Sequence, residues 1–273
     1  MKRYAEPIQS AQNPKVKLWA QLLDKKGRDK QGAYLVEGIH LVQEAIRFEA
    51  SVQTLLYSAE RGMPAEIEAL LDSGAVAECF PVSEQVLAKC SDAQTPQPVI
   101  AIVNKAGDEA ERLLVRENSL VVVVDSVQDP GNLGTIIRSA DAVGATGVVL
   151  GKGTVDLYNP KTVRSTMGSM FHLPVVEADL LPLLAKAREQ GVRLLNTSLQ
   201  AKQSCYEADL TGPVWFVLGN EGKGVSSEVA AQIGEHVIIP MKGPAESLNV
   251  AMAATVLLFE AMRQRGYPPK INT

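Results

Sequence analysis

The stretch Leu120–Val124 (LVVVV) most narrows what this chain can fold into. It holds no polar residue and is dominated by β-branched valines, which suits a parallel strand covered on both faces. The turn Asp129–Asn132 follows; its proline fixes φ, and its glycine and asparagine tolerate positive φ. A buried strand, a tight turn and a helical stretch predict one βα unit of a parallel α/β sheet.

The same alternation continues on both sides of this unit. After it, we expect strands at 147–150, 192–196, 214–218 and 236–239 and helices at 131–143, 179–189, 226–232 and 247–264. Before it, we expect helices at 12–24, 38–48, 65–71 and 83–89, strands at 33–36, 52–57, 76–80 and 99–103, and a basic loop at 25–32. The charge-rich stretch 105–118 separates the halves. The sequence therefore predicts a smaller α/β domain at 1–104, a linker at 105–118 and a parallel α/β domain at 119–273.

Composition excludes several other classes. The 273 residues are 46% hydrophobic and 21% charged, as in ordinary globular proteins and unlike disordered or fibrous chains. There is no run of 18 apolar residues and no apolar N-terminal stretch, so we expect neither a membrane span nor a signal peptide. The three cysteines form no CxxC pair and the three histidines no HExxH motif, which predicts no metal and a reducing, cytoplasmic location.

Charge is distributed unevenly along the chain. The net charge is −4, yet residues 1–30 hold eight Lys and Arg against three Asp and Glu. A basic segment on an acidic chain suits an anionic partner, although each lysine taken alone is equally well explained as a solvated side chain.

Three segments place polar residues just beyond strand ends, where open α/β sheets bind ligands. In the first, Asn132 and Arg138 lie one and a half helical turns apart, and we expect them to face one site at a helix N-terminus. The alternative is an ordinary turn with Asn132 as a cap and Arg138 in solvent. In the second, GNEGKG at 219–224, Glu221 sits on a glycine-rich turn; the alternative places Glu221 and Lys223 in solvent.

The third segment, 238–265, opens a long helix with Ser247, Leu248 and Asn249. Ser247 is the expected N-cap, and the alternative is simply a capped core helix. No GxGxxG follows a strand, and the stretch around Lys152 lacks Walker A spacing, so a nucleotide-binding oxidoreductase and a P-loop hydrolase are disfavoured.

These segments, DPGNLGTIIRSADA, LGNEGKG and IPMKGPAESLNVAMA in that order, resemble the SpoU (TrmH-type) RNA 2′-O-ribose methyltransferases of the SPOUT superfamily. NPKVK, YLVEGIHLVQEA and CSDAQTPQPVIAIV are similar to the family's N-terminal L30e-like substrate-binding domain. The chain departs from the family pattern at Pro98, where glycine is usual, and at Ser139, where threonine is common. The resemblance implies a deep trefoil knot, S-adenosyl-L-methionine as cofactor, and a homodimer that packs through the helix after Asn249.

The resemblance also implies the site residues. The catalytic set comprises Arg138, Asn132, Glu221, Ser247 and Asn249. Cofactor contacts are expected from Leu218, Gly219, Asn220, Ile239, Met241, Ser247, Leu248 and Asn249. RNA contacts are expected from Lys15, Lys17, Lys25, Lys26, Arg28 and Arg164. His172 is expected to be structural.

Arg138 has two interpretations. The family proposal makes it the proton acceptor for the ribose hydroxyl, whereas its high pKa favours a clamp on the adjacent phosphate that stabilises developing alkoxide charge. The expected activity is methyl transfer to a ribose 2′-OH of structured RNA, with 23S rRNA first and tRNA second. The alternative is a non-catalytic RNA-binding or ribosome-associated protein that keeps the fold.

Overall fold

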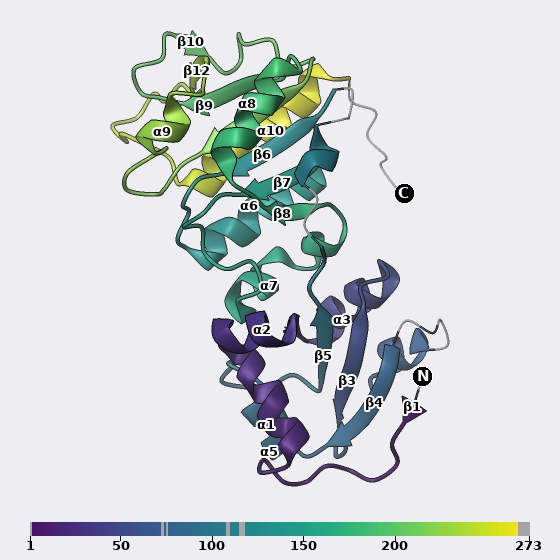
Figure 1. The fold of residues 1–273 in the computed structure, drawn as a ribbon. Helices are drawn as coiled ribbons and strands as arrows, with labels where there is room; N and C mark the ends of the chain where they lie inside the picture. Colours follow the sequence, from purple (N-terminus) through teal and green to yellow (C-terminus); the bar gives the residue numbers. More distant parts are fainter. Residues whose placement is uncertain (1, 72–73, 75, 108–109, 115–117, 267–273) are drawn as a thin grey trace. The chain divides into compact units, whose positions relative to one another are not determined.

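The computed structural model describes residues 2–71, 74, 76–107, 110–114 and 118–266. Internal contacts divide the chain into two compact units. The first unit is Met1–Gly107 with Asp156–His172, and the second is Asp108–Val155 with Leu173–Thr273. Each unit contains one sheet (Figure 1).

The sheet of the second unit is entirely parallel, as the sequence predicts. Its strand order is β10-β12-β9-β11-β6-β7-β8. The strands are β6 (Leu120–Val124), β7 (Gly147–Leu150), β8 (Val175–Glu177), β9 (Arg193–Thr197), β10 (Gln203–Ser204), β11 (Val214–Leu218) and β12 (Glu235–Ile238). Every residue of β6 and of β11 is buried, which explains their uninterrupted apolar sequences. The short strands β8 and β10 were not expected.

Four α-helices of this unit lie among the described residues. They are α6 (Pro130–Ala142), α8 (Leu180–Glu189), α9 (Ser227–Ala230) and α10 (Val250–Gln264), with a 3-10 turn at Ala110–Leu113. Asp129 caps α6 by accepting a hydrogen bond from the Asn132 N–H at 2.8 Å. The expected cap of α10 was wrong: Asn249, not Ser247, accepts the first N–H groups, those of Ala251 and Met252.

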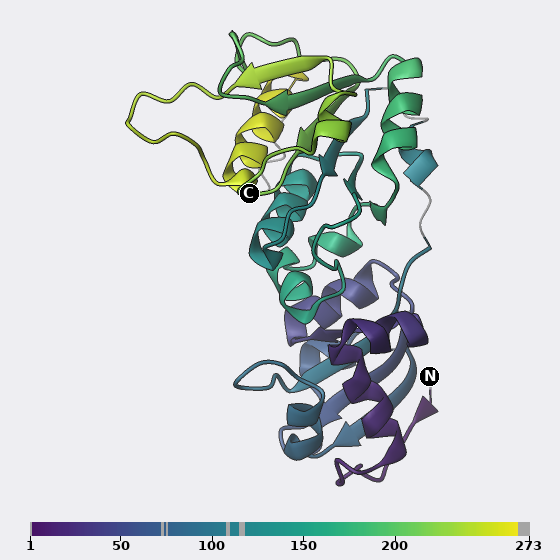
Figure 2. The ribbon, with the colours of Figure 1, turned by 60° about the vertical axis from the view of Figure 1, so that its left-hand side comes forward.

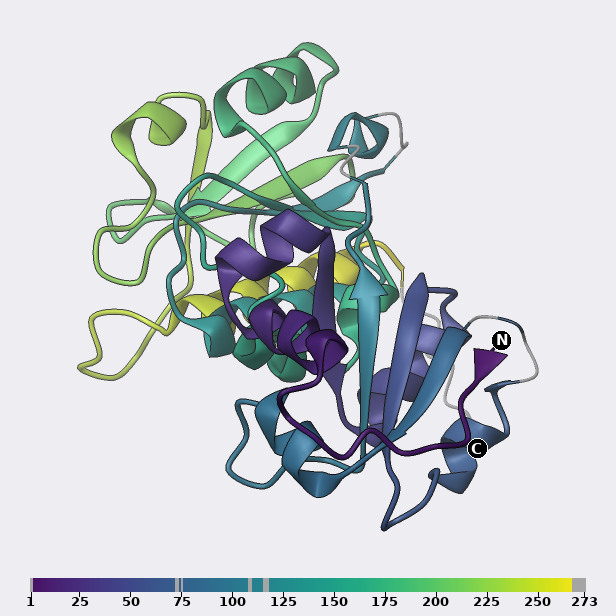
Figure 3. The same cartoon turned by 60° about the horizontal axis from the view of Figure 1, so that its bottom comes forward.

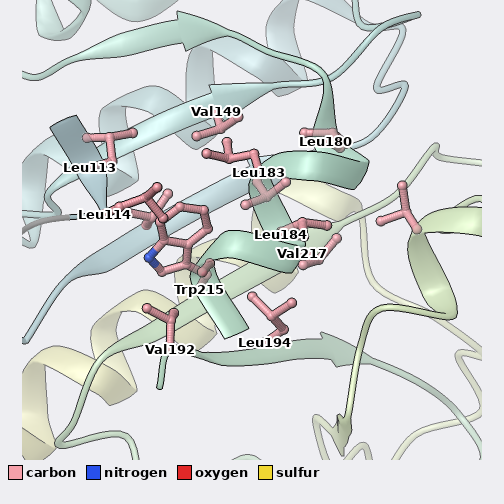
Figure 4. Close-up of a cluster of buried hydrophobic side chains, with 14 of the residues drawn as sticks. Leu113, Leu114, Val149, Leu180, Leu183, Leu184, Val192, Leu194, Trp215 and Val217 are labelled. Carbon is pink, nitrogen blue, oxygen red and sulfur yellow. The ribbon is translucent and has the colours of Figure 1, made fainter. Parts of the chain in front are cut away.

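Helices α6 and α10 pack against each other beside the sheet. The Ser139 and Thr255 hydroxyls share a hydrogen bond of 2.7 Å across this contact. Ser139, where the family commonly has threonine, therefore serves helix packing. In a core cluster of this unit, Trp215 is fully buried among leucines and valines (Figure 4). Its indole N–H donates to the Ser119 hydroxyl at 3.1 Å. That bond satisfies the only polar group of a large core side chain.

The first unit has a mixed sheet of order β1-β4-β3-β5-β2. Its strands are β1 (Lys2–Arg3), β2 (Ala33–Glu37), β3 (Val52–Ser58), β4 (Val76–Val82) and β5 (Val99–Asn104). Its helices are α1 (Pro14–Ala20), α2 (Lys25–Gln31), α3 (Ile39–Arg47), α4 (Ala65–Glu68), α5 (Glu84–Lys89) and α7 (Pro160–Thr166), with 3-10 turns at Gln21–Leu23 and Ser169–Phe171. Strands β3, β4 and β5 run side by side (Figure 3). Helix α7 and strand β1 were not expected.

Two expectations about this unit differ from the structure. Residues 25–32, expected as a loop, form α2, which ends at Gly32 in the left-handed conformation with φ +61°. Residues Asp156–His172, expected within the methyltransferase domain, group with the first unit. Arg28 links the two segments: it is 2% exposed, bonds Asp156 at 2.6 Å, and donates to the Leu22 and Leu23 carbonyls. No helix within the described ranges is long and apolar enough to span a membrane.

Candidate active site

The site lies in the second unit, on loops that follow the carboxyl ends of β6 and β11 and on the loop between β12 and α10. Figure 2 shows this last loop extending away from the sheet. Asn220 lies two residues after the end of β11 and connects two of the loops by hydrogen bonds. Its amide N–H₂ donates to the Ser126 carbonyl at 2.9 Å, and its amide oxygen accepts the Gly222 and Lys223 N–H groups at 3.0 and 3.1 Å. Buried Asp125 adds a bond from the Ser226 N–H at 2.7 Å.

The side chains of Asn249, Asn132 and Glu221 form a chain of hydrogen bonds, called the relay below, that joins the three motifs. The Asn249 amide donates to the Asn132 side-chain oxygen at 2.9 Å, and the Asn132 amide donates to Glu221 at 2.9 Å. Glu221 also accepts the backbone N–H groups of Gln128 and Asp129, both at 3.1 Å. Three side chains far apart in the sequence therefore form one continuous polar chain.

Glu221 is ionised in this arrangement. Partial burial opposes its charge, but the bonds from the Asn132 side chain and the surrounding backbone N–H groups outweigh burial and hold the pKa of Glu221 below its ordinary value. Its two oxygens accept three hydrogen bonds at 3.1 Å or less. The carboxylate is thus engaged as an acceptor that fixes loop geometry.

Arg138 projects from α6 into solvent. Within the described residues it has neither an ion pair nor a hydrogen-bond partner. Six residues along a helix correspond to about 600°, so its direction diverges by about 120° from that of Asn132, whose amide is turned to Glu221 and Asn249. A guanidinium without an internal partner is available to bind an anion from outside the chain.

A pocket of about 210 Å³ opens beside the relay. Of the predicted cofactor contacts, Ile239, Met241, Ser247 and Leu248 line it. The remaining predicted contacts, Leu218, Gly219, Asn220 and Asn249, are not part of its lining. Ser247 belongs to the pocket and makes no bond in the relay.

Five lining residues were not among the predicted cofactor contacts: Thr197, Ser198, Leu199, Ile238 and Ala253. Thr197 and Ile238 are the last residues of β9 and β12, and Ser198 and Leu199 follow β9 directly. The rule that parallel sheets bind ligands at this edge could have identified these four. The lining combines aliphatic side chains with the hydroxyl groups of Thr197, Ser198 and Ser247. That combination fits a ligand with a flat apolar ring and a hydroxylated sugar.

Gly219 has a structural role in addition to the expected cofactor contact. A Cβ at this position would lie 2.1 Å from the Gly224 carbonyl carbon and the Val225 nitrogen. The loop folds back on itself here through a pair of hydrogen bonds between Asn220 and Gly224, each of 2.9 Å. Glycine is therefore required for the turn that presents Glu221.

The predicted RNA-binding residues fall into two groups. Arg28 is buried and bound to Asp156 and two carbonyls, so the structure corrects its assignment as an RNA contact. Arg164 bonds Asp92 through both terminal nitrogens; the arginine holds the pKa of Asp92 below its ordinary value. Lys25 pairs with Asp29 at 3.4 Å.

The remaining lysines are more accessible. Lys15 lies 4.3 Å from the Phe80 ring centre and 3.8 Å from Glu78, whereas Lys17 and Lys26 are exposed and have no ion pair in the described part of the chain. Across the described ranges, no three His, Cys, Asp or Glu side chains gather as a metal-binding group.

A polar relay and a hydroxyl-lined pocket at the carboxyl edge of a parallel sheet are typical of α/β proteins that bind a ligand at that edge. Comparison with known proteins identifies the family. Residues 119–259 match the model of the SpoU rRNA Methylase family, and residues 13–101 match the MRM3-like substrate binding domain. The chain belongs to the SpoU rRNA methylase family, which confirms the resemblance seen in the sequence. Its class is that of the RNA 2′-O-methyltransferases that use S-adenosylmethionine.

Similar proteins match over nearly the whole chain. The 23S rRNA (guanosine(2553)-2′-O)-methyltransferase RlmP of Bacillus subtilis is 38% identical, covering 92% of this chain and 97% of that protein. The crystal structure of an rRNA methyltransferase from Sinorhizobium meliloti aligns with TM-score 0.86 at 33% identity, covering 96% and 98%. That of the SpoU methyltransferase AviRb from Streptomyces viridochromogenes with AdoMet aligns with TM-score 0.84 at 34% identity, covering 93% and 98%.

Proposed function

We propose that this protein transfers a methyl group from S-adenosylmethionine to a ribose 2′-OH of 23S rRNA. The observation that carries the proposal is the relay Asn249–Asn132–Glu221, which unites the three motifs beside the pocket. The full-length relative RlmP is named for the same reaction on 23S rRNA, which favours rRNA over tRNA. We also propose that the reaction takes place in the cytoplasm, in keeping with an rRNA substrate.

Residues of this chain suit the cofactor. Ile239, Met241 and Leu248 offer aliphatic contacts for an adenine ring, and the hydroxyl groups of Ser198 and Ser247 offer partners for its polar groups. When bound, the cofactor supplies a methyl group on a positively charged sulfur. The proposed contacts from Leu218, Gly219, Asn220 and Asn249 belong to the turns that frame the pocket.

For the ribose oxygen to accept a methyl group, its hydroxyl proton must leave. Glu221 is poorly suited to accept that proton, because both its oxygens are occupied by N–H donors. An arginine side chain offers N–H donors and no acceptor for a proton. We assign Arg138 to clamp the phosphate beside the target ribose and stabilise developing negative charge on the oxygen. The proton then passes to water or to an RNA phosphate oxygen.

The relay residues act by positioning. Asn132 and Asn249 fix the start of α6 against the start of α10, and Glu221 fixes both to the glycine-rich turn. Correct orientation of reacting groups lowers a barrier by several kcal/mol in favourable cases, about 7–11 kcal/mol at most.

We also propose that the protein is a homodimer that packs through α10, and that its C-terminal segment is threaded as a deep trefoil knot. Met252 and Phe259 are 49% and 44% exposed, and Val256 lies between them on the same face of the helix. The opposite face of α10 is buried in the unit's own core through residues such as Leu257 and Leu258. A second copy would cover this apolar stripe.

The test uses unmodified 23S rRNA transcript and S-adenosylmethionine labelled in the methyl group. Wild-type protein should transfer label to a position that resists alkaline cleavage. Arg138→Ala should bind the cofactor within a few-fold of wild type and lose most of the transfer rate. Cofactor binding by the wild type without transfer to the transcript or to total RNA would favour the non-catalytic alternative.

A further inference from the structure

The cations of the second unit fall into two classes. Those with partners include Lys186, which pairs with Glu111 at 2.7 Å, and Arg263, which pairs with Glu260 at 2.7 Å. Arg193 pairs with Glu235, and Arg265 donates to three backbone carbonyls. Ordinary surface cations on a chain of net charge −4 therefore find internal partners in this unit.

Most of the cations without partners lie on segments at one edge of the sheet. Within the described part of the unit, five basic side chains have no ion pair or hydrogen bond: Arg138, Lys152, Lys202, Lys223 and Lys242. The four lysines all lie on segments that follow strand carboxyl ends, those of β7, β9, β11 and β12. This is the edge that carries the relay and the pocket.

The backbones of two of these lysines are hydrogen-bonded to the loops that carry the relay. The Lys152 carbonyl accepts the Ser126 hydroxyl at 3.2 Å, and the Ser126 carbonyl accepts the Asn220 amide at 2.9 Å. The other end of the Asn220 amide holds the Lys223 N–H at 3.1 Å. The backbones of Lys152 and Lys223 are thus both linked to the loop that begins at Ser126.

No nearby acid forms an ion pair with these lysines in the described part of the unit. Glu221 accepts N–H groups from Asn132, Gln128 and Asp129, and the Asp129 carboxylate caps α6. Buried Asp125 accepts the Ser226 N–H and the Ser126 hydroxyl. Lys242 shares its loop with the exposed Glu246, so it is the weaker member of the group.

We infer that Lys152 and Lys223 form a phosphate-binding clamp on the methyltransferase unit itself, which grips the RNA backbone on either side of the target nucleotide. The inference rests on the proposed function, and it adds a substrate contact surface distinct from the lysines of residues 1–30. Lysine suits this role as a flexible point charge that binds phosphate without reading base identity. The clamp supplies affinity and register, while base choice is left to other contacts.

The test compares Lys152→Gln, Lys223→Gln and the double variant with Lys186→Gln, which removes a paired lysine from the last turn of α8. Each clamp variant should raise the KM for the 23S rRNA transcript by about 3–10-fold, and the double variant should multiply the effects. The dependence of log Kd for RNA on log salt should become shallower by about one per lysine removed. The Kd for S-adenosylmethionine should not change, and Lys186→Gln should match wild type throughout.

The outcomes separate the two proposals. Absence of wild-type methyl transfer would defeat the proposed function, and the salt dependence of RNA binding would still test the clamp. Wild-type transfer together with an unchanged RNA KM and salt slope in the double variant would overturn the clamp and leave the methyltransferase assignment standing. A rise in KM that is equally large for Lys186→Gln would also overturn it, because general charge loss would then explain the effect.

Discussion

Replacement of Glu221 by glutamine tests whether the relay depends on a carboxylate. The two carboxylate oxygens accept the Asn132 amide at 2.9 Å and the Gln128 and Asp129 N–H groups at 3.1 Å each. Glutamine offers one oxygen and turns an N–H₂ group toward at least one of these donors. A hydrogen bond to a charged group contributes about 1.5–3 kcal/mol when buried. Because Glu221 is exposed, we expect a loss of about 1–2 kcal/mol.

That loss corresponds to about a 5–30-fold fall in kcat/KM for RNA, since about 1.4 kcal/mol is tenfold in rate. The assay is initial-rate methyl transfer at several RNA concentrations, with the cofactor Kd measured separately. Glu221→Asp is the matched control, because it keeps the charge and shortens the reach. The reasoning would be refuted by a glutamine variant within twofold of wild type, or by a loss confined to cofactor affinity.

The pH dependence of the same relay has a definite sign. The pKa of Glu221 is held below its ordinary value, so its contribution is complete above about pH 4.3 and is lost only as pH falls through the lowered pKa. Between pH 6 and 9, the pH–rate profile of the wild type should therefore have no inflection that is missing from the profile of Glu221→Gln.

Three other changes have defined outcomes. Arg28→Met should lower the free energy of unfolding by about 3 kcal/mol, because it leaves the nearly buried Asp156 carboxylate without its ion-pair partner. Chemical denaturation should show this loss, and the affinity for the cofactor should be unchanged. Asn220→Ala should reduce methyl transfer at saturating cofactor by tenfold or more, since one amide holds two loops; Asn220→Asp should not restore it, because a carboxylate cannot donate to the Ser126 carbonyl. Phe259→Glu should convert the proposed dimer to monomer in sedimentation, and a wild-type monomer at micromolar concentration would contradict the α10 interface.

Local sequence was sufficient for the principal strands of both units. The valines of β6 and the apolar run of β11 needed no partner information, because a strand buried on both faces is apolar throughout. The Asp129–Asn132 turn likewise marked the start of α6 to within two residues. Short elements such as α7 and β8 were missed, since a few residues carry too little periodic pattern to be recognised.

The motifs of the sequence were also sufficient to predict Asn132, Glu221 and Asn249 as members of one site. Their mutual bonds were decided by tertiary structure, because the bonded pairs are separated by 89 and 117 residues and meet only when parallel strands align their carboxyl ends. The same reason explains why Arg28, which lies in a basic segment of the sequence, was predicted to contact RNA. Its partner Asp156 lies 128 residues away, and burial of that pair takes the charge out of the surface on which an RNA could bind.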